Sequence, residues 1–121
     1  MNKESANQEL REELEHAKKR GFLVLVEGKN DKKAFEELGF ENVFAIDKMP
    51  HYRVVEEAVK RAKDVMIMTD LDKEGKKLYR YFNHHLCQNG VRVHNQLREF
   101  MFKNTQLRQM EGLVNYLKRR E

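Results

Sequence analysis

The chain has 121 residues, of which 40% are hydrophobic and 36% are charged. This length fits one domain with one core, residues 1–121, and no apolar run nears the roughly 20 residues of a membrane-spanning helix. The first residues lack an apolar secretory segment, and a single cysteine cannot form a disulfide within the chain. We therefore expect a cytoplasmic protein without disulfides or membrane contact.

Charge is unevenly distributed along the chain, although the net charge is only +4. Residues 1–72 carry 13 Lys/Arg and 16 Asp/Glu, whereas residues 73–121 carry 11 and 4. A basic second half is typical of proteins that bind a phosphate-rich partner, and it is equally typical of ordinary solvated helix faces.

The first predicted element is a helix over residues 6–20. Ser5 and Gln8 have the spacing of a capping box, and Leu10, Leu14 and Ala17 recur at helical intervals before a glycine. The apolar stripe is narrow, which predicts a helix that packs over the edge of the domain or against a protein partner.

Short apolar runs then alternate with helical patterns. The runs, at residues 22–26, 43–46, 65–69 and 91–93, are too short for helices and too uniformly apolar for half-exposed strands. Helical patterns connect them, and two more follow over residues 96–121. This alternation predicts an α/β fold over residues 21–95, with a four-stranded parallel sheet of order 2-1-3-4, helices on both faces and additional terminal helices.

Acidic residues stand at the ends of the first and third predicted strands. Glu27 precedes Gly28, and Asp70 and Asp72 precede Gly75. In the order 2-1-3-4 these strand ends meet at the switch point of the sheet, where ligands bind in such folds. Three crowded carboxylates repel one another unless a cation joins them, and their oxygens suit Mg²⁺ or Mn²⁺. The two glycines would let a phosphate or a backbone approach closely.

Other interpretations of these acids stay open. Asp70 or Asp72 alone would more often cap the helix that begins near residue 73, and Glu27 could be a solvated turn residue. A calcium loop is excluded, because its twelfth position would be Tyr81 and no helix precedes it.

The two motifs, VEGKND at 26–31 and TDLDKEG at 69–75, resemble the Toprim domain of topoisomerases, primases, OLD-type nucleases and ribosomal RNA maturases. The resemblance covers about residues 21–95, and the EGKxD form is most similar to the maturase branch and to small stand-alone Toprim proteins. It implies a Toprim/Rossmann-like fold and a magnesium site that makes or breaks phosphodiester bonds.

The resemblance also implies roles for individual residues. Glu27 would be a metal ligand or general acid/base, while Asp70 and Asp72 would hold one or two Mg²⁺ ions. Lys29 would contact a phosphate, and Asp31 would be a supporting acid or the N-cap of the next helix. Basic residues past the site could track a nucleic-acid backbone or simply face solvent: Lys73, Lys76, Lys77 and Arg80, with a weaker argument for Arg92 and Arg98.

Three functions follow as hypotheses. The first is a Mg²⁺-dependent nuclease or phosphoryl-transfer enzyme acting on RNA or DNA, with RNA processing preferred. The second is a non-catalytic module that binds metal and nucleic acid and is recruited to a processing complex through its terminal helices. The third is a receiver-like domain with Asp70 as phosphoacceptor, which the single acid after the first strand and the lack of a fifth strand disfavour.

Overall fold

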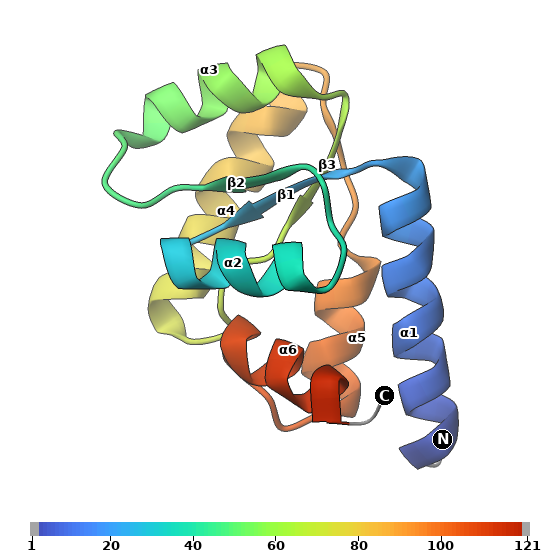
Figure 1. Ribbon diagram of the computed structural model, residues 1–121. Coiled ribbons are helices and arrows are strands. Elements are labelled where there is room, and N and C mark those ends of the chain that lie inside the picture. Colours follow the sequence, from blue (N-terminus) through green and yellow to red (C-terminus); the bar gives the residue numbers. More distant parts are fainter. Residues whose placement is uncertain (1–2, 120–121) are drawn as a thin grey trace.

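The protein is an α/β sandwich, described for residues 3–119 by a computed structural model (Figure 1). Its elements in chain order are α1 (Lys3–Arg20), β1 (Leu23–Val26), α2 (Lys29–Glu37), β2 (Val43–Ala45), α3 (His51–Arg61), β3 (Asp64–Ile67), α4 (Lys73–Gln88), β4 (Arg92–Val93), α5 (Gln96–Asn104) and α6 (Met110–Arg119). No helix in this part of the chain combines the length and apolarity needed to cross a bilayer.

The strands form one parallel sheet with the order β2-β1-β3-β4, which confirms the predicted fold. The two central strands are β1 and β3, and they pair with Leu25 opposite Ile67. From β1 the chain winds outward to β2 on one side, and from β3 it winds outward to β4 on the other. The switch point therefore lies between the carboxyl ends of β1 and β3.

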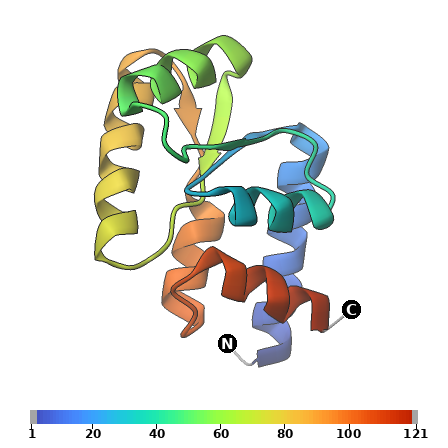
Figure 2. The same cartoon turned by 60° about the vertical axis from the view of Figure 1, so that its left-hand side comes forward.

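Each face of the sheet carries its own hydrophobic core, because successive strand residues point to opposite faces. Leu23 and Leu25 of β1 pack with α3 and α4, whereas Val24 and Val26 pack with α1, α2, α5 and α6. Figures 1 and 2 show these two groups of helices on either side of the strands. Burial on both faces explains why the strands read as continuous apolar runs.

The terminal helices pack on the domain itself. Helix α1 begins at Lys3, so Ser5 lies inside the helix instead of at its start, in keeping with the strong helix propensity of the preceding Lys and Glu. Its apolar stripe, including Leu10 and Leu14, is buried in the same core as α5 and α6. Helices α5 and α6 lie within the segment predicted to be helical, residues 96–121, whose last two residues fall outside the described part.

The turn from β3 into α4 brings two backbone segments into unusually close contact. A Cβ atom at Gly75 would lie 2.0 Å from the carbonyl oxygen of Asp70 and 2.9 Å from its nitrogen. The buried hydroxyl of Thr69 donates a hydrogen bond of 2.8 Å to the Gly75 carbonyl. The first turn of α4 is thus fixed against the end of β3.

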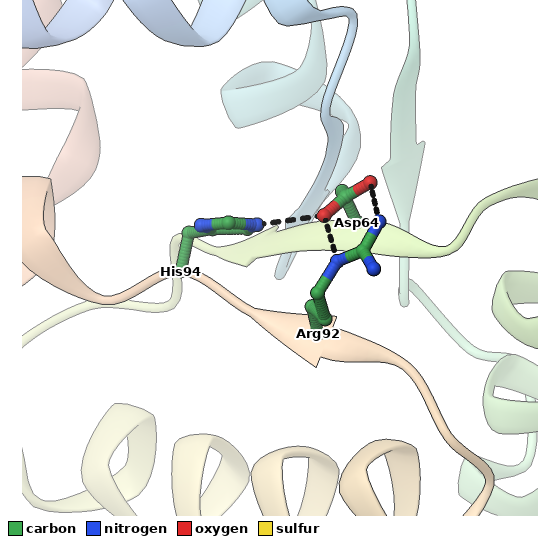
Figure 3. Close-up of polar contacts among 3 residues, drawn as sticks. All are labelled: Asp64, Arg92 and His94. Carbon is green, nitrogen blue, oxygen red and sulfur yellow. Dashed lines mark hydrogen bonds and ion pairs between the residues drawn. The ribbon is translucent and has the colours of Figure 1, made fainter.

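A polar cluster joins β3 to β4 at their amino-terminal ends, on the side of the sheet opposite the turn from β3 into α4 (Figure 3). The Asp64 carboxylate accepts hydrogen bonds from Arg92 Nε at 2.8 Å and Nη2 at 3.0 Å, and its Oδ1 lies 2.9 Å from His94 Nε2. The His94 ring stacks on Phe22 with centroids 4.1 Å apart. The hydrogen bonds from Arg92, followed by those from His94, hold the pKa of Asp64 far below its usual value. This cluster anchors the two-residue edge strand.

Replacing Gly75 with Ala is expected to destabilise the fold by at least about 2–3 kcal/mol, because the methyl group would overlap the Asp70 backbone. Gly112→Ala is the matched control: it lies within α6, its nearest non-neighbouring atom would be 3.5 Å away, and it should stabilise the protein by about 0.5–1 kcal/mol. Urea denaturation measures both. Equal effects of the two variants would contradict the close contact.

Asp64→Asn should lower the free energy of unfolding at pH 7 and have a diminishing effect in acid. A depressed folded-state pKa stabilises the protein above the unfolded-state pKa of about 3.9, and this contribution disappears as the pH falls through that value toward the lower folded-state pKa. Denaturation at several pH values between 7 and 2, with the exposed loop variant Glu41→Gln as control, measures the difference. If the difference in free energy of unfolding between wild type and Asp64→Asn stays constant down to pH 2, this role of Asp64 is excluded.

Candidate active site

The carboxylate of Glu27 bridges the ends of the two central strands. Glu27 directly follows β1, and its Oε2 accepts a hydrogen bond of 2.6 Å from the backbone N–H of Asp70, beyond the end of β3. These two predicted site residues are therefore brought together at the switch point, 43 residues apart in the sequence.

Asp70 is held by two helices from the end of the chain. Its Oδ1 accepts a hydrogen bond of 2.8 Å from the backbone N–H of Met110, the first residue of α6. From α5, Arg98 donates to the Thr69 carbonyl at 3.1 Å and to the Asp70 carbonyl at 2.9 Å. The guanidinium of Arg98 in turn lies 4.4 Å from the Tyr79 ring centroid.

Asp72 caps helix α4, whereas Asp31 is not the N-cap of α2, the alternative that the sequence left open, because Gly28 holds that position. Asp72 is the N-cap of α4, and its Oδ1 accepts a hydrogen bond of 2.8 Å from Gly75 N–H. Asp31 stands in the first turn of α2, where its Oδ2 accepts a hydrogen bond of 3.3 Å from the backbone of the N-cap Gly28. Each carboxylate has two oxygens, so capping through one leaves the other for a ligand.

Burial, followed by the charges of neighbouring acids, raises the pKa of Glu27, Asp70 and Asp31. Burial is the largest cause for Glu27, and the charges of Asp70, Asp72 and Asp31 raise its pKa further against the hydrogen bond from Asp70 N–H. Burial also raises the pKa of Asp70, opposed by the hydrogen bond from Met110 and reinforced by Asp72. The pKa of Asp31 rises through burial and the charge of Asp70. These carboxylates thus share one electrostatic environment.

A pocket of about 340 Å³ opens beside Asp70. It lies between the start of α2 and the start of α6 and is lined by Gly28, Lys29, Asn30, Asp31, Asp47, Asp70, Gln109 and Glu111. Lys29 is exposed at its rim and lies 3.6 Å from the Asp47 carboxylate. Four more of the predicted basic residues are exposed on α4, namely Lys73 and Lys76 in its first turn and Lys77 and Arg80 after them.

The donor set fits a divalent ion in chemistry. Glu27, Asp70 and Asp72 supply hard oxygen ligands, and their mutual repulsion is what a cation would relieve. Among the described residues, however, no group of three or more His, Cys, Asp or Glu side chains is arranged so that it could hold a metal ion by itself. Mg²⁺ commonly binds through one or two carboxylates together with waters and substrate phosphate, so such an arrangement suits it.

Sequence reasoning missed several contributors to the site. Met110 acts through its backbone, which leaves no trace in residue type. Glu111 and Asp47 line the pocket from segments without a motif, and only the fold brings them near Asp70. The guanidinium of Arg98, a candidate phosphate contact from the sequence, instead holds two carbonyls behind the acids. Arg92 lies at the opposite edge of the sheet, paired with Asp64.

Residues 22–97 match the model of the Toprim domain. A UPF0292 protein of Methanocaldococcus jannaschii is 35% identical over 101 residues, which cover 80% of this chain and 79% of that protein. A UPF0292 protein of Methanosarcina barkeri is 28% identical over 115 residues, covering 91% of this chain and 79% of that one.

Two solved structures share the fold. A protein from Aquifex aeolicus superposes with a TM-score of 0.71 and 27% identity, covering 91% of this chain and 97% of the other. The zinc-binding and RNA polymerase domains of the Aquifex aeolicus primase give a TM-score of 0.51 and 27% identity, covering 88% of this chain and 27% of the primase chain.

Asp70→Asn should raise the melting temperature at pH 7 in EDTA by about 2–5 °C, because it removes charge repulsion while Asn can still accept the Met110 hydrogen bond. Mg²⁺ should raise the melting temperature of the wild type and have little effect on the variant. Calorimetry with and without Mg²⁺ measures both, with the exposed α3 variant Glu56→Gln as control. Equal Mg²⁺ responses in wild type and Asp70→Asn would rule out a cation at Asp70.

Proposed function

Because the chain belongs to the Toprim domain family, we propose that it catalyses Mg²⁺-dependent phosphodiester chemistry on nucleic acid, as a nuclease or related phosphoryl-transfer enzyme. The proposed metal and catalytic residues are Glu27, Asp70 and Asp72. Lys29, Lys73 and Lys76 are proposed to contact phosphates, and Gly28, Asp31 and Gly75 to support the site.

One observation carries the proposal: the Glu27 carboxylate and the Asp70 backbone meet at the switch point, 2.6 Å apart. Both motifs of the family are thereby joined at the edge of the sheet where ligands bind in open parallel folds. The likeness to the primase supports nucleic acid as the substrate class.

The residues divide the chemistry between them. When bound, Mg²⁺ supplies Lewis-acid stabilisation of charge on a phosphate oxygen. Asp70 and Asp72 would hold the ion through the carboxylate oxygens that do not accept from Met110 and Gly75. Glu27 is the candidate for proton transfer at Oε1, because burial and neighbouring acids raise its pKa while Oε2 is fixed by Asp70 N–H.

A second candidate is a non-catalytic module that binds metal and nucleic acid. The capping role of Asp72 favours it, because Gly75 N–H already engages one of the Asp72 carboxylate oxygens. On this alternative a processing complex would recruit the module through its terminal helices. Nucleic-acid binding would then survive Glu27→Gln, with no product formed by either protein.

Two finer features belong to the proposal. The EGKxD motif at residues 27–31, most similar to ribosomal RNA maturases, favours RNA over DNA and an RNA-processing role. A cytoplasmic location agrees with that role and with the exposed thiol of Cys87, which a reducing compartment would keep free.

Labelled RNA and DNA incubated with the protein should be cleaved with Mg²⁺ and remain intact in EDTA. Glu27→Gln should lower the rate at least about 100-fold, as loss of a general acid or base does. The double variant Asp70→Asn, Asp72→Asn should abolish turnover. Product analysis on denaturing gels measures all three.

Glu56→Gln serves as the matched control, since it neutralises an exposed carboxylate on α3 outside the site. It should cleave at the wild-type rate. Cleavage by the double variant at the wild-type rate would refute the site, and binding without product in any protein would favour the second candidate.

A further inference from the structure

A second hollow, here called the α4/α5 groove, lies between helices α4 and α5 and has a volume of about 350 Å³. Its polar and aromatic walls are Lys76, Tyr79 and Arg80 from α4 and Arg98, Phe102 and Lys103 from α5. None of these α5 residues belongs to either family motif. The groove is distinct from the pocket beside Asp70.

The charge of the groove suits phosphate. Four cationic side chains line it, and Glu99 is the one carboxylate among the lining residues of the described chain. This excess contrasts with the acids at the adjoining strand ends. The cations of the groove would offset the repulsion between a bound polyanion and the nearby carboxylates.

The groove also offers an apolar surface of the kind that stacks on bases. Phe102 is 44% exposed, and Phe102 and Tyr52 are the two large hydrophobic residues that stand exposed in the described part of the chain. The nitrogen of Lys76 lies 5.1 Å from the Phe102 ring centroid and the Arg108 guanidinium carbon 4.9 Å. An exposed aromatic ring among cations is typical of sites that hold an unpaired base next to its phosphate.

The groove adjoins the backbone that carries Asp70 and Asp72. Leu71, which stands between Asp70 and Asp72, lines it. Arg98 also lines it and donates hydrogen bonds to the carbonyls of Thr69 and Asp70. A chain of nucleotides in the groove would therefore lie next to the backbone segment that bears Asp70 and Asp72.

We infer that the α4/α5 groove binds single-stranded nucleic acid, with a base stacked on Phe102 and phosphates contacted by Lys76, Arg80 and Lys103. Single strands are specified because a duplex hides the faces of its bases from a side chain. The inference rests on the proposed function, because it takes the strand in the groove to be the substrate of the neighbouring acids. It adds that this substrate is single-stranded.

The absence of tryptophan from the sequence permits a direct test. Phe102→Trp introduces a single reporter whose emission should be quenched on titration with single-stranded RNA or DNA 12-mers in EDTA, where no turnover occurs. Tyr52→Trp places the same reporter on α3, at a residue 61% exposed and outside the groove, and its emission should stay constant.

Affinity measurements with labelled 12-mers complete the test. Phe102→Ala should weaken binding at least about fivefold, the loss expected for one stacked base. Arg80→Glu and Lys103→Glu should each weaken binding. The slope of log K against log salt concentration should become less steep by about 0.7 for each phosphate that is no longer neutralised. Tyr52→Ala should bind as the wild type does, and thermal melts should establish that every variant is folded.

Competing ligands decide between alternatives. Equal quenching of the Phe102→Trp variant by a duplex, by a nucleoside monophosphate at the same nucleotide concentration, or by a polyglutamate peptide would overturn the inference. So would unchanged emission with both 12-mers. Because these measurements are made without turnover, failure of the groove leaves the proposed catalysis standing, and failure of cleavage leaves the groove to be judged on binding alone.

Discussion

The site depends on how tightly the backbone of Asp70 is held. Gly75 lies so close to it that a side chain would overlap the Asp70 carbonyl, Glu27 accepts its N–H, and Arg98 donates to its carbonyl. Three separate segments of the chain thus fix the backbone of Asp70 just beyond the end of β3. A rigid strand end of this kind holds the carboxylates in one place, which is what a site for charged ligands requires.

Holding these acids close together is electrostatically unfavourable for the folded state. Burial and mutual repulsion raise the pKa of Glu27 and Asp70, so the charged forms are disfavoured where they stand. Backbone N–H groups from Asp70 and Met110 offset part of that cost. Acids kept together despite repulsion are typical of functional sites, because a purely structural role would be served by neutral side chains.

The sequence predicted the sheet and the two acidic strand ends because both are local signals. Buried strands such as β1 read as continuous apolar runs, Glu27 follows β1 directly, and Asp70 lies just beyond the end of β3. Contacts made by backbone groups, such as Met110 N–H on Asp70, leave no pattern in residue type. The groove could not be predicted from the sequence, because the exposure of Phe102 and its distance from Lys76 depend on how α5 packs against α4.

The hydrogen bond from Met110 to Asp70 gives the last helix a part in the acidic centre, although the family match ends at residue 97. The structural unit that forms the acidic centre therefore extends beyond the segment that the family model matches. Grafting the matched segment into another scaffold would transfer the acids without the Met110 N–H that orients the Asp70 carboxylate. In a comparison of relatives, divergence beyond that boundary is where differences in selectivity among otherwise similar centres would arise.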